Sequence, residues 1–401
     1  MTKVVCFVNR RSRDFTTGKL CLSDFSQGES ERARGFLGRF SAYTRTPLHD
    51  LAGRARALGV REVLVKDEGD RFGLKAFKVT GGAYAVGRFL AQKLGVDIGH
   101  LRPGRELIDK IKDRWGQFVF VTGSSGNHGT GLAWVSQALE QRAIIYVPKG
   151  TAVFRKAKLA GLGAEVVETE LDYDDTVDLA RQVAREKGYQ LIADTGWEDY
   201  QEVPVWIMQG YTTIFNEVVE QMAEGGKKPP THVFLHGGVG SFSGAAVGYF
   251  SGIWKHRRSK FVVIEPTSAA CLLESARQAD GKAHRSKEKI DTVMAGLGCA
   301  EPNPMAWPIL FDYADFFISC SDSVAEDGMR EYARVVGDDP QIISGASGAA
   351  GMGVLTTLMN NKDYSEIKSK LGIGLNSRIL LFNTEGDTDP EHYREICGEN
   401  F

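Results

Sequence analysis

The feature of this sequence that most constrains its fold is a regular alternation of short apolar runs with helical segments. Glycine or proline separates the two kinds of segment, and helices are expected to begin near Asn127, Thr151 and Asp174. This alternation is typical of α/β proteins whose strands are mostly parallel. Strands are expected at 62–66, 118–121, 143–147, 165–168, 190–193, 232–236, 261–265, 316–319 and 378–382.

The beginning of the chain is less regular. Residues 1–45 mix short apolar runs with polar segments, which predicts an N-terminal arm with at most one strand. Residues 48–58 have the pattern of an amphipathic helix, and Gly59 is expected to end it. Because 401 residues exceed the usual size of one hydrophobic core, we expect two domains.

Composition argues against several kinds of partner. A formal net charge of −2 gives no long-range field that would attract nucleic acid or an acidic membrane. The apolar run near the start, residues 4–8, is too short for a signal sequence or a membrane span. We therefore expect a cytoplasmic protein with no nucleic-acid or membrane partner.

Metal binding is not expected either. The histidines form no ligand cluster, and the six cysteines are scattered without CxxC spacing. Free buried thiols are the expected state, and the sequence leaves open whether Cys271 and Cys299 pair. The cysteines lie at Cys6, Cys21, Cys271, Cys299, Cys320 and Cys397.

The stretch RFGLKAFKVTGGAYAV (71–86) places Lys78 where a glycine-containing loop meets an apolar helix of small residues. A helix start carries partial positive charge, and apolar neighbours such as Phe77 and Val79 would remove water from the amine. Both effects favour a neutral amine, which can form a Schiff base. Most helix lysines are solvated, so this stretch alone also fits an ordinary surface residue.

A second polar segment, TGSSGNHG (122–129), follows a predicted strand and opens a helix. The hydroxyls of Ser124 and Ser125 meet unencumbered N–H groups at the positive end of that helix, an arrangement that suits a carboxylate. A plain strand-to-helix turn with a serine cap explains the same residues. Asn127 and His128 favour a binding site, because neither is a good choice for merely starting a helix.

A third segment, HGGVGSFSG (236–244), is again a strand, a glycine-rich turn and a helix. Its N–H groups can close on a phosphate. The glycines approximate a dinucleotide-binding fingerprint, with Glu265 near the place of a ribose-binding acid. However, the third glycine falls one residue late, and a dehydrogenase would leave the other two segments unexplained.

Pyridoxal phosphate needs a Schiff-base lysine, a phosphate cup and a polar group at its ring. The ordered segments resemble those of the fold-type II pyridoxal phosphate enzymes, the tryptophan synthase β-subunit group, and within it the diaminopropionate ammonia-lyases. The resemblance covers most of the chain. It rests on KDEGDRFGLKAFKVTGGAYAV (66–86), GNHGTGLAW (126–134), DTGWEDY (194–200), VWIMQGY (205–211), LGCAEPNP (297–304), FISCSDSVA (317–325), SGASGA (344–349) and NTEGDTD (383–389).

The resemblance implies a two-domain, three-layer α/β/α fold with mostly parallel twisted sheets. Residues 1–85 and 211–401 would form a large cofactor-binding domain, and residues 86–210 a smaller mobile one. Lys78 would hold the cofactor as a Schiff base, Asn127 would lie beside the ring hydroxyl, and Thr384 would meet the pyridine nitrogen. The phosphate would bind at Gly238, Val239, Gly240 and Ser241.

The resemblance also implies roles at the substrate. Asp194 matches an acid that moves protons opposite the lysine face, although an aspartate capping the turn 194–196 is an alternative. Ser124, Ser125 and His128 would hold the substrate carboxylate. Two acids of the ammonia-lyases are replaced here, by Ser125 and by Ala346. Ser125 is a candidate catalytic residue in place of the first acid, but its hydroxyl can substitute only if a nearby group lowers its pKa. Loss of the first should impair action on the D-isomer, whose proton faces away from Lys78.

The function implied is elimination of ammonia from 2,3-diaminopropionate, the L-isomer being favoured, to give pyruvate and ammonia. A homodimer is implied as well. Alternatives on the same fold are a serine/threonine dehydratase, a racemase and a β-replacement synthase. A cofactor-binding regulatory protein without activity is a further alternative, motivated by the two missing acids.

Overall fold

The computed structural model describes residues 3–13, 22–255 and 259–398; Cys21 lies outside these ranges. Within them, the strands are β1 (Val4–Val8), β2 (Leu48–Asp50), β3 (Glu62–Asp67), β4 (Val119–Gly123), β5 (Arg142–Val147), β6 (Glu165–Glu168), β7 (Gln190–Leu191), β8 (His232–His236), β9 (Lys260–Pro266), β10 (Phe316–Cys320) and β11 (Arg378–Asn383).

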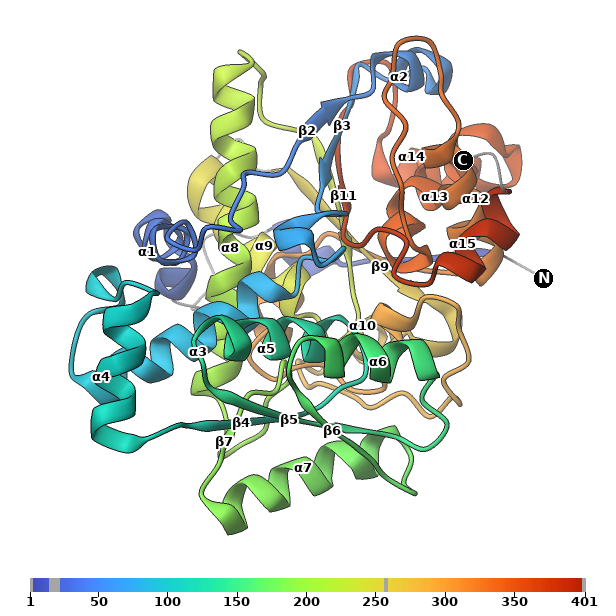
Figure 1. The fold of residues 1–401 in the computed structure, drawn as a ribbon. Helices are drawn as coiled ribbons and strands as arrows, with labels where there is room; N and C mark the ends of the chain where they lie inside the picture. Colours follow the sequence, from blue (N-terminus) through green and yellow to red (C-terminus); the bar gives the residue numbers. More distant parts are fainter. Residues whose placement is uncertain (1–2, 14–21, 256–258, 399–401) are drawn as a thin grey trace. The chain divides into compact units, whose positions relative to one another are not determined.

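The α-helices of the same ranges are α1 (Gln27–Leu37), α2 (Ala52–Leu58), α3 (Val79–Leu94), α4 (Arg105–Trp115), α5 (Asn127–Ala138), α6 (Val153–Gly161), α7 (Tyr173–Lys187), α8 (Glu202–Glu224), α9 (Ser241–Trp254), α10 (Cys271–Gln278), α11 (Trp307–Tyr313), α12 (Asp322–Ala333), α13 (Ala346–Asn360), α14 (Ser365–Leu371) and α15 (Pro390–Cys397). Strands and helices alternate along most of the chain, as the sequence predicts (Figure 1).

The chain divides into two compact units. Unit 1 comprises Met1–Gln27, Arg45–Arg71 and Ile214–Phe401, and unit 2 comprises Gly28–Thr44 and Phe72–Thr213. The last boundary falls inside α8, so this one helix belongs to both units. The units differ from the expected boundaries, because residues 28–44, 72–85 and 211–213 group with unit 2. Unit 2 therefore contains Lys78.

Unit 1 is built on a seven-stranded sheet in the order β1-β10-β9-β8-β11-β3-β2. The five inner strands are parallel, and the short edge strands β1 and β2 are antiparallel to their neighbours. Parallel strands end at the same edge of a sheet, so the turns after β8 and β11 emerge together. β8 and β11 are neighbours, with Ile379 paired to His232 and Leu380 to Val233.

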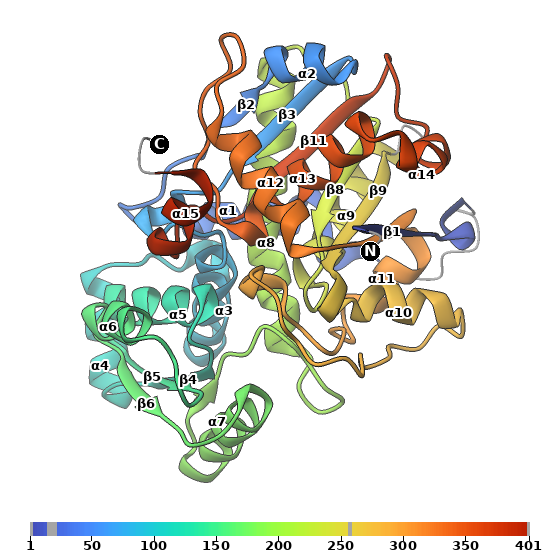
Figure 2. The same ribbon diagram turned by 90° about the vertical axis from the view of Figure 1, so that its right-hand side faces the viewer.

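Both faces of this sheet are covered, which explains its nearly continuous apolar strands. On one face, residues such as Val63, Ile264 and Leu381 form a core with α2, α12, α13, α14 and α15. On the other face, the ring of Phe382 contacts Phe215 of α8 and Phe242 of α9, with ring centroids 5.7 and 5.4 Å away. Figure 2 shows α12 and α13 over the first face.

Unit 2 has a four-stranded parallel sheet in the order β6-β5-β4-β7. One face packs on α7 through a small core that includes Val121, Ile144 and Ala180. The helices α3, α5 and α6 lie on the opposite side (Figure 1). Both units are thus helix–sheet–helix layers, which confirms the predicted fold class.

The expectations for residues 1–58 were met only in part. Among the described residues of the first 45, β1 is the one strand, as expected, but the eleven-residue helix α1 was not predicted. Residues 48–50 form β2, which pairs with β3, and the helix starts only at Ala52. Gly59 ends that helix as predicted, in a left-handed conformation with φ of 65°. None of the helices in the described ranges has the length and hydropathy that a membrane span requires.

Candidate functional site

Lys78 is the residue directly before α3, as the sequence predicts. Glycines let the start of this helix approach its neighbours closely. A Cβ on Gly81 would lie 2.5 Å from a ring carbon of Tyr211, and a Cβ on Gly210 would lie 2.4 Å from the carbonyl oxygen of Thr80. The first turn of α3 is therefore held tightly against α8.

Helix α5 holds the start of α3 from another direction. A Cβ on Gly131 would lie 2.8 Å from the Cα of Val79 and 3.4 Å from the carbonyl carbon of Lys78. Only glycine permits this approach, because real Cβ atoms do not come so close to backbone. The backbone of Lys78 is thus fixed next to the first turns of α5.

The amine of Lys78 forms an ion pair and a hydrogen bond with the Oδ2 atom of Asp194. Both side chains are about one-fifth exposed, at 21% and 19%. Burial alone would raise the pKa of Asp194, but Lys78 and, to a smaller degree, His128 outweigh it and hold that pKa below its usual range. The structure therefore brings an ionised carboxylate directly to the predicted reactive lysine.

Tyr211 is a residue of this site that the sequence did not single out. It is buried, and its ring packs edge-on against Phe77, with ring centroids 4.9 Å apart. Burial raises the pKa of the Tyr211 hydroxyl, and the electrostatic influence of Lys78 lowers it only in part. The tyrosine lies in the VWIMQGY block, where nothing in the local pattern separates it from core aromatics.

The turn after β4 carries Ser124, Ser125 and Asn127. It is tight, since a Cβ on Gly129 would lie 2.0 Å from the carbonyl oxygen of Ser124. The two serine side chains are half-buried, and their hydroxyls make no hydrogen bond within the described part of the chain. They stand at the N-terminus of the twelve-residue helix α5, which favours an anion.

His128 lies deeper than its neighbours in this turn. It is 3% exposed, and its Nε2 atom donates a hydrogen bond to the carbonyl oxygen of Ile192 at 2.8 Å. Its Nδ1 atom has no hydrogen-bond partner among the described residues. Since Ile192 precedes Asp194 by two positions, His128 ties the serine turn to the segment that carries the acid.

The glycine-rich turn after β8 leads into the fourteen-residue helix α9. Gly238 and Gly240 have φ values of 62° and 93°, in the left-handed region that favours glycine. The N–H groups of Gly238 and Val239 have no acceptor among the described residues. Free N–H donors at the start of a helix fit a phosphate group.

Neighbouring side chains fix the shape of this turn. Asn303 donates from Nδ2 to the hydroxyl of Ser241 at 2.8 Å, and its backbone N–H donates to the carbonyl of Val239 at 2.7 Å. The thiol of Cys271 contacts the carbonyl oxygen of Gly238 at 3.6 Å. Cys271 and Cys299 do not form a disulfide with each other.

The environment of Glu265 argues against the alternative that this turn binds a dinucleotide. Its carboxylate is fully buried and accepts hydrogen bonds from the N–H groups of Leu272 and Leu273, both at 2.8 Å. Burial raises the pKa of Glu265 to about 8. A carboxylate that caps α10 in this way is not presented to a ribose.

Thr384 directly follows β11, the strand beside β8. It is 4% exposed, and its hydroxyl makes no hydrogen bond within the part of the chain that the structure describes. Its neighbour Asn383 donates to Asp67 at 2.7 Å and to the carbonyl of Ile343 at 2.9 Å. These contacts hold the end of β11 in place, and the hydroxyl of Thr384 remains available for a hydrogen bond to a ligand.

Glu385 and Ser347 also lie at this edge of the sheet and were not predicted. The N–H of Ser347 donates to the carboxylate of Glu385 at 3.2 Å, and the hydroxyl of Ser347 accepts from the N–H of Gly296 at 3.0 Å. Ala346, the position of a missing family acid, is the first residue of α13 and is buried. The Glu385 carboxylate thus stabilises the start of this helix.

The predicted residues form two groups, one in each unit. In unit 2, Lys78 meets Asp194 and lies beside α5, whose start carries Ser124, Ser125, Asn127 and His128. In unit 1, the carboxyl edge of the sheet carries Thr384 and the turn from Gly238 to Ser241. The sequence motifs named these residues but did not divide them in this way.

Similarity to known proteins identifies the family of this chain. Residues 40–371 match the family model described as pyridoxal-phosphate dependent enzyme. The chain is 42% identical to diaminopropionate ammonia-lyase of Salmonella typhimurium over 389 residues, which cover 97% of this chain and 96% of the relative.

Solved structures give the same result. A crystal structure of Escherichia coli diaminopropionate ammonia-lyase, in complex with an aminoacrylate-PLP azomethine reaction intermediate, superposes with a TM-score of 0.89. A second crystal structure of that protein, in complex with D-serine, also has a TM-score of 0.89. Each is 41% identical to this chain and covers 99% of it, and this chain covers 97% of each.

Proposed function

This chain belongs to the family of pyridoxal-phosphate dependent enzymes, and we propose that it eliminates ammonia from 2,3-diaminopropionate to give pyruvate and ammonia. The geometric observation that carries the proposal is the pairing of the Lys78 amine with the Asp194 carboxylate. Such an elimination requires an amine that takes the proton from the α-carbon, and it is assisted by an ionised carboxylate that stabilises the leaving β-amine in its ammonium form.

The side chains present fit the cofactor. The free N–H groups of Gly238 and Val239, with Gly240 and Ser241, would bind its phosphate, and the Thr384 hydroxyl would meet its ring nitrogen. Asn127 would lie beside the ring hydroxyl, and Lys78 would hold the cofactor covalently. When bound, pyridoxal phosphate withdraws electrons from the substrate and so acidifies the proton on its α-carbon.

Lys78 and Asp194 would have different roles at the substrate. Once the substrate has displaced it, the amine of Lys78 is free to accept the α-proton. Asp194 keeps a lowered pKa beside Lys78. It would therefore pair with the ammonium form of the substrate's β-amine and assist its departure as ammonia. His128 would hold this segment in place through Ile192.

Ser124 and Ser125 would bind the substrate carboxylate. Their free hydroxyls lie at the positive end of α5, where an anion is stabilised by backbone N–H groups. A serine hydroxyl is a poor proton acceptor at neutral pH, so the face opposite Lys78 lacks a base at Ser125. We therefore expect the L-isomer to be the better substrate.

A panel of amino acids tests the proposed function. Purified protein loaded with pyridoxal phosphate is mixed with both enantiomers of diaminopropionate, and with serine, threonine and O-acetylserine, and pyruvate and ammonia are measured. We expect release from L-diaminopropionate, and none with Lys78→Ala. Turnover of serine or threonine alone would indicate a dehydratase, and product formation only with an added thiol would indicate a β-replacement synthase. If none of these compounds is turned over, the remaining hypothesis is a cofactor-binding regulatory protein without activity.

We further propose that the protein is a cytoplasmic homodimer that acts on small amino acids, without a nucleic-acid or membrane partner. The low net charge and the scattered cysteines support this setting. The mass measured by light scattering during size-exclusion chromatography tests the dimer. A mass near 44.0 kDa, that of one chain, would refute it.

A further inference from the structure

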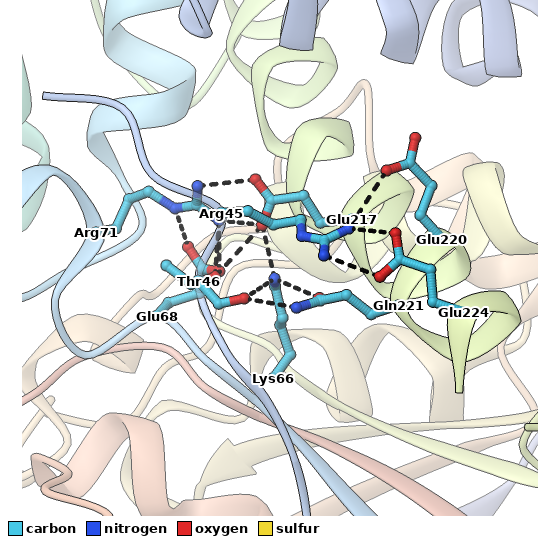
Figure 3. A network of polar contacts seen from close by, with 9 residues as sticks. All are labelled: Arg45, Thr46, Lys66, Glu68, Arg71, Glu217, Glu220, Gln221 and Glu224. Carbon is cyan, nitrogen blue, oxygen red and sulfur yellow. Dashed lines mark hydrogen bonds and ion pairs between the residues drawn. The ribbon is translucent and has the colours of Figure 1, made fainter. Parts of the chain in front are cut away.

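Four charged side chains form a fully buried network inside unit 1 (Figure 3). Lys66 and Arg71 supply two positive charges, and Glu68 and Glu217 supply two negative charges; all four are 0% exposed. Thr46 and Gln221 complete the network. Its charges balance, but burying each of them costs hydration free energy that ion pairing only partly recovers.

Arg71 lies at the centre of the network. Its guanidinium donates to both oxygens of Glu68, at 2.7 and 2.8 Å, and to both oxygens of Glu217, at 2.9 and 2.7 Å. It also donates to the hydroxyl of Thr46 at 2.9 Å. Only the planar fork of arginine can bind two carboxylates in this bidentate manner.

Lys66 makes three further contacts on the other side of Glu217. Its amine donates to Glu217 at 2.6 Å, to the carbonyl of Thr46 at 2.7 Å and to the side-chain oxygen of Gln221 at 2.9 Å. Burial would raise the pKa of Glu217, but Arg71 and Lys66 outweigh this effect and lower it to about 2. The glutamate therefore stays ionised at neutral pH.

The network joins three segments at which the chain changes from one unit to the other. The chain re-enters unit 1 at Arg45, next to Thr46, and leaves it again directly after Arg71. It returns to unit 1 at Ile214, one turn of α8 before Glu217. At the surface, Arg45 adds hydrogen bonds to Glu224 of the same helix at 2.8 and 2.9 Å.

The same loop is tied to the strand that carries Thr384. The N–H of Glu68 donates to the carbonyl of Asn383 at 2.8 Å, and the side chain of Asn383 donates to Asp67 at 2.7 Å. Beyond Arg71, the chain takes left-handed backbone at Phe72, Gly73 and Lys75 and then reaches Lys78. Arg71 is thus the last fixed point of unit 1 before the reactive lysine.

We infer that Arg71 is a positioning residue for Lys78, acting through the network that clamps these three chain segments. This inference rests on the proposed function. Its physical basis is that a buried ion network contributes little net stability but enforces one geometry. Small displacements of a reacting group are costly, since a shift of about 1 Å can reduce the rate by about a hundredfold.

The substitution Arg71→Lys tests the inference, because it keeps the charge and removes the bidentate fork. Arg54→Lys is the matched control. Arg54 is another buried arginine of unit 1, with a 4% exposed side chain paired to Glu331, and it adjoins none of the three segments. Both variants, loaded with cofactor, are assayed with L-diaminopropionate at a temperature well below their melting temperatures.

We expect Arg71→Lys to lose about 10- to 100-fold in kcat while KM changes by less than about threefold. Its bound cofactor should keep a visible absorption band. Arg54→Lys should lower the melting temperature yet keep kcat. An unchanged kcat in Arg71→Lys, or an equal loss in both variants, would overturn the inference.

A second measurement covers the case in which Arg71→Lys does not fold, or the wild type has no activity. The double variant Arg71→Met with Glu68→Gln removes one charge of each sign, which leaves Lys66 paired with Glu217. Hydrogen–deuterium exchange of the cofactor-loaded protein should then rise in peptides covering 66–78 and 214–224, and not in β9. If the wild type eliminates nothing, the proposed function fails, but exchange confined to these peptides still supports the clamp. Unchanged exchange there would refute it.

Discussion

The amine of Lys78 and the carboxylate of Asp194 form an ion pair although 116 positions separate them in the sequence. The lysine is fixed by close glycine contacts of α3 with α5 and α8, and the aspartate follows β7 in the sheet of unit 2. The two side chains that the proposed elimination uses are therefore in contact before any substrate arrives. Their contact gives the first prediction.

Asp194→Asn should lower kcat by about 10²- to 10⁴-fold, the range for loss of one acid or base, while the cofactor stays bound. The amide keeps the shape of the side chain but carries no negative charge to stabilise the ammonium form of the leaving group. Pyruvate release from L-diaminopropionate and the visible absorption band measure the two effects. Asp199→Asn is the control, since Asp199 is 61% exposed and pairs with Arg181. Equal activity of Asp194→Asn and the wild type would contradict the assigned role.

Ser125→Asp should raise kcat/KM for D-diaminopropionate by about tenfold or more, because a carboxylate supplies the base that serine lacks. The N-terminus of α5 favours the added negative charge, so the fold should tolerate it. Rates on both enantiomers check the prediction, and Ser124→Asp is the control for added charge alone. A gain in both variants would show that charge, rather than position, is responsible.

Gly238→Ala should weaken cofactor binding about tenfold, because alanine at a φ of 62° is strained by about 1–3 kcal/mol. Titration of the apoprotein with pyridoxal phosphate gives the dissociation constant. Gly252→Ala, near the other end of α9, is the control: a Cβ there would meet no atom within 4 Å. Unaltered affinity in Gly238→Ala would argue against a phosphate at this turn.

Stability should fall as the pH drops from 7 to 5, partly because of His236. Burial lowers the pKa of this 3% exposed histidine from 6.5 to about 4. The unfolded chain therefore binds a proton near pH 6.5 that the folded chain does not, so the stability present above pH 6.5 is lost toward pH 4. The loss at pH 5 is about 2 kcal/mol.

Chemical denaturation at pH 7 and pH 5 measures this loss. His236→Leu should show a smaller difference between the two pH values, since leucine does not titrate. His100→Leu should behave like the wild type, because His100 is exposed. The same pH dependence in all three proteins would exclude His236 as its source.

Sequence patterns predicted the strands well because buried parallel strands are continuous apolar runs bounded by glycine or proline. α1 was missed because it is mostly polar and depends on distant contacts. Its Ser30 donates to the carbonyl of Thr212, and its Phe36 packs against Tyr84. β2 was missed because a strand of three residues has no readable period.

Sequence motifs were enough to predict the site residues, but not the side chains that contact them in the fold. Lys66, Glu68 and Arg71 lie in a stretch, KDEGDR, that reads as a polar surface loop. Their burial depends on Glu217, which is distant in sequence and lies on α8, a helix that is buried over most of its length. Tyr211 is similar, since only the packing of α3 on α8 places it beside the reactive lysine.

The position of β11 means that the larger sheet can be completed only late in synthesis. β11 is the last strand of the sequence among the described residues, yet it lies between β8 and β3 in the middle of the larger sheet. A nascent chain that has not yet reached Arg378 therefore exposes two strand edges that only β11 can join. Such edges favour pairing with other chains. Truncation before β11 should thus yield an aggregation-prone protein even though most of both units has been made.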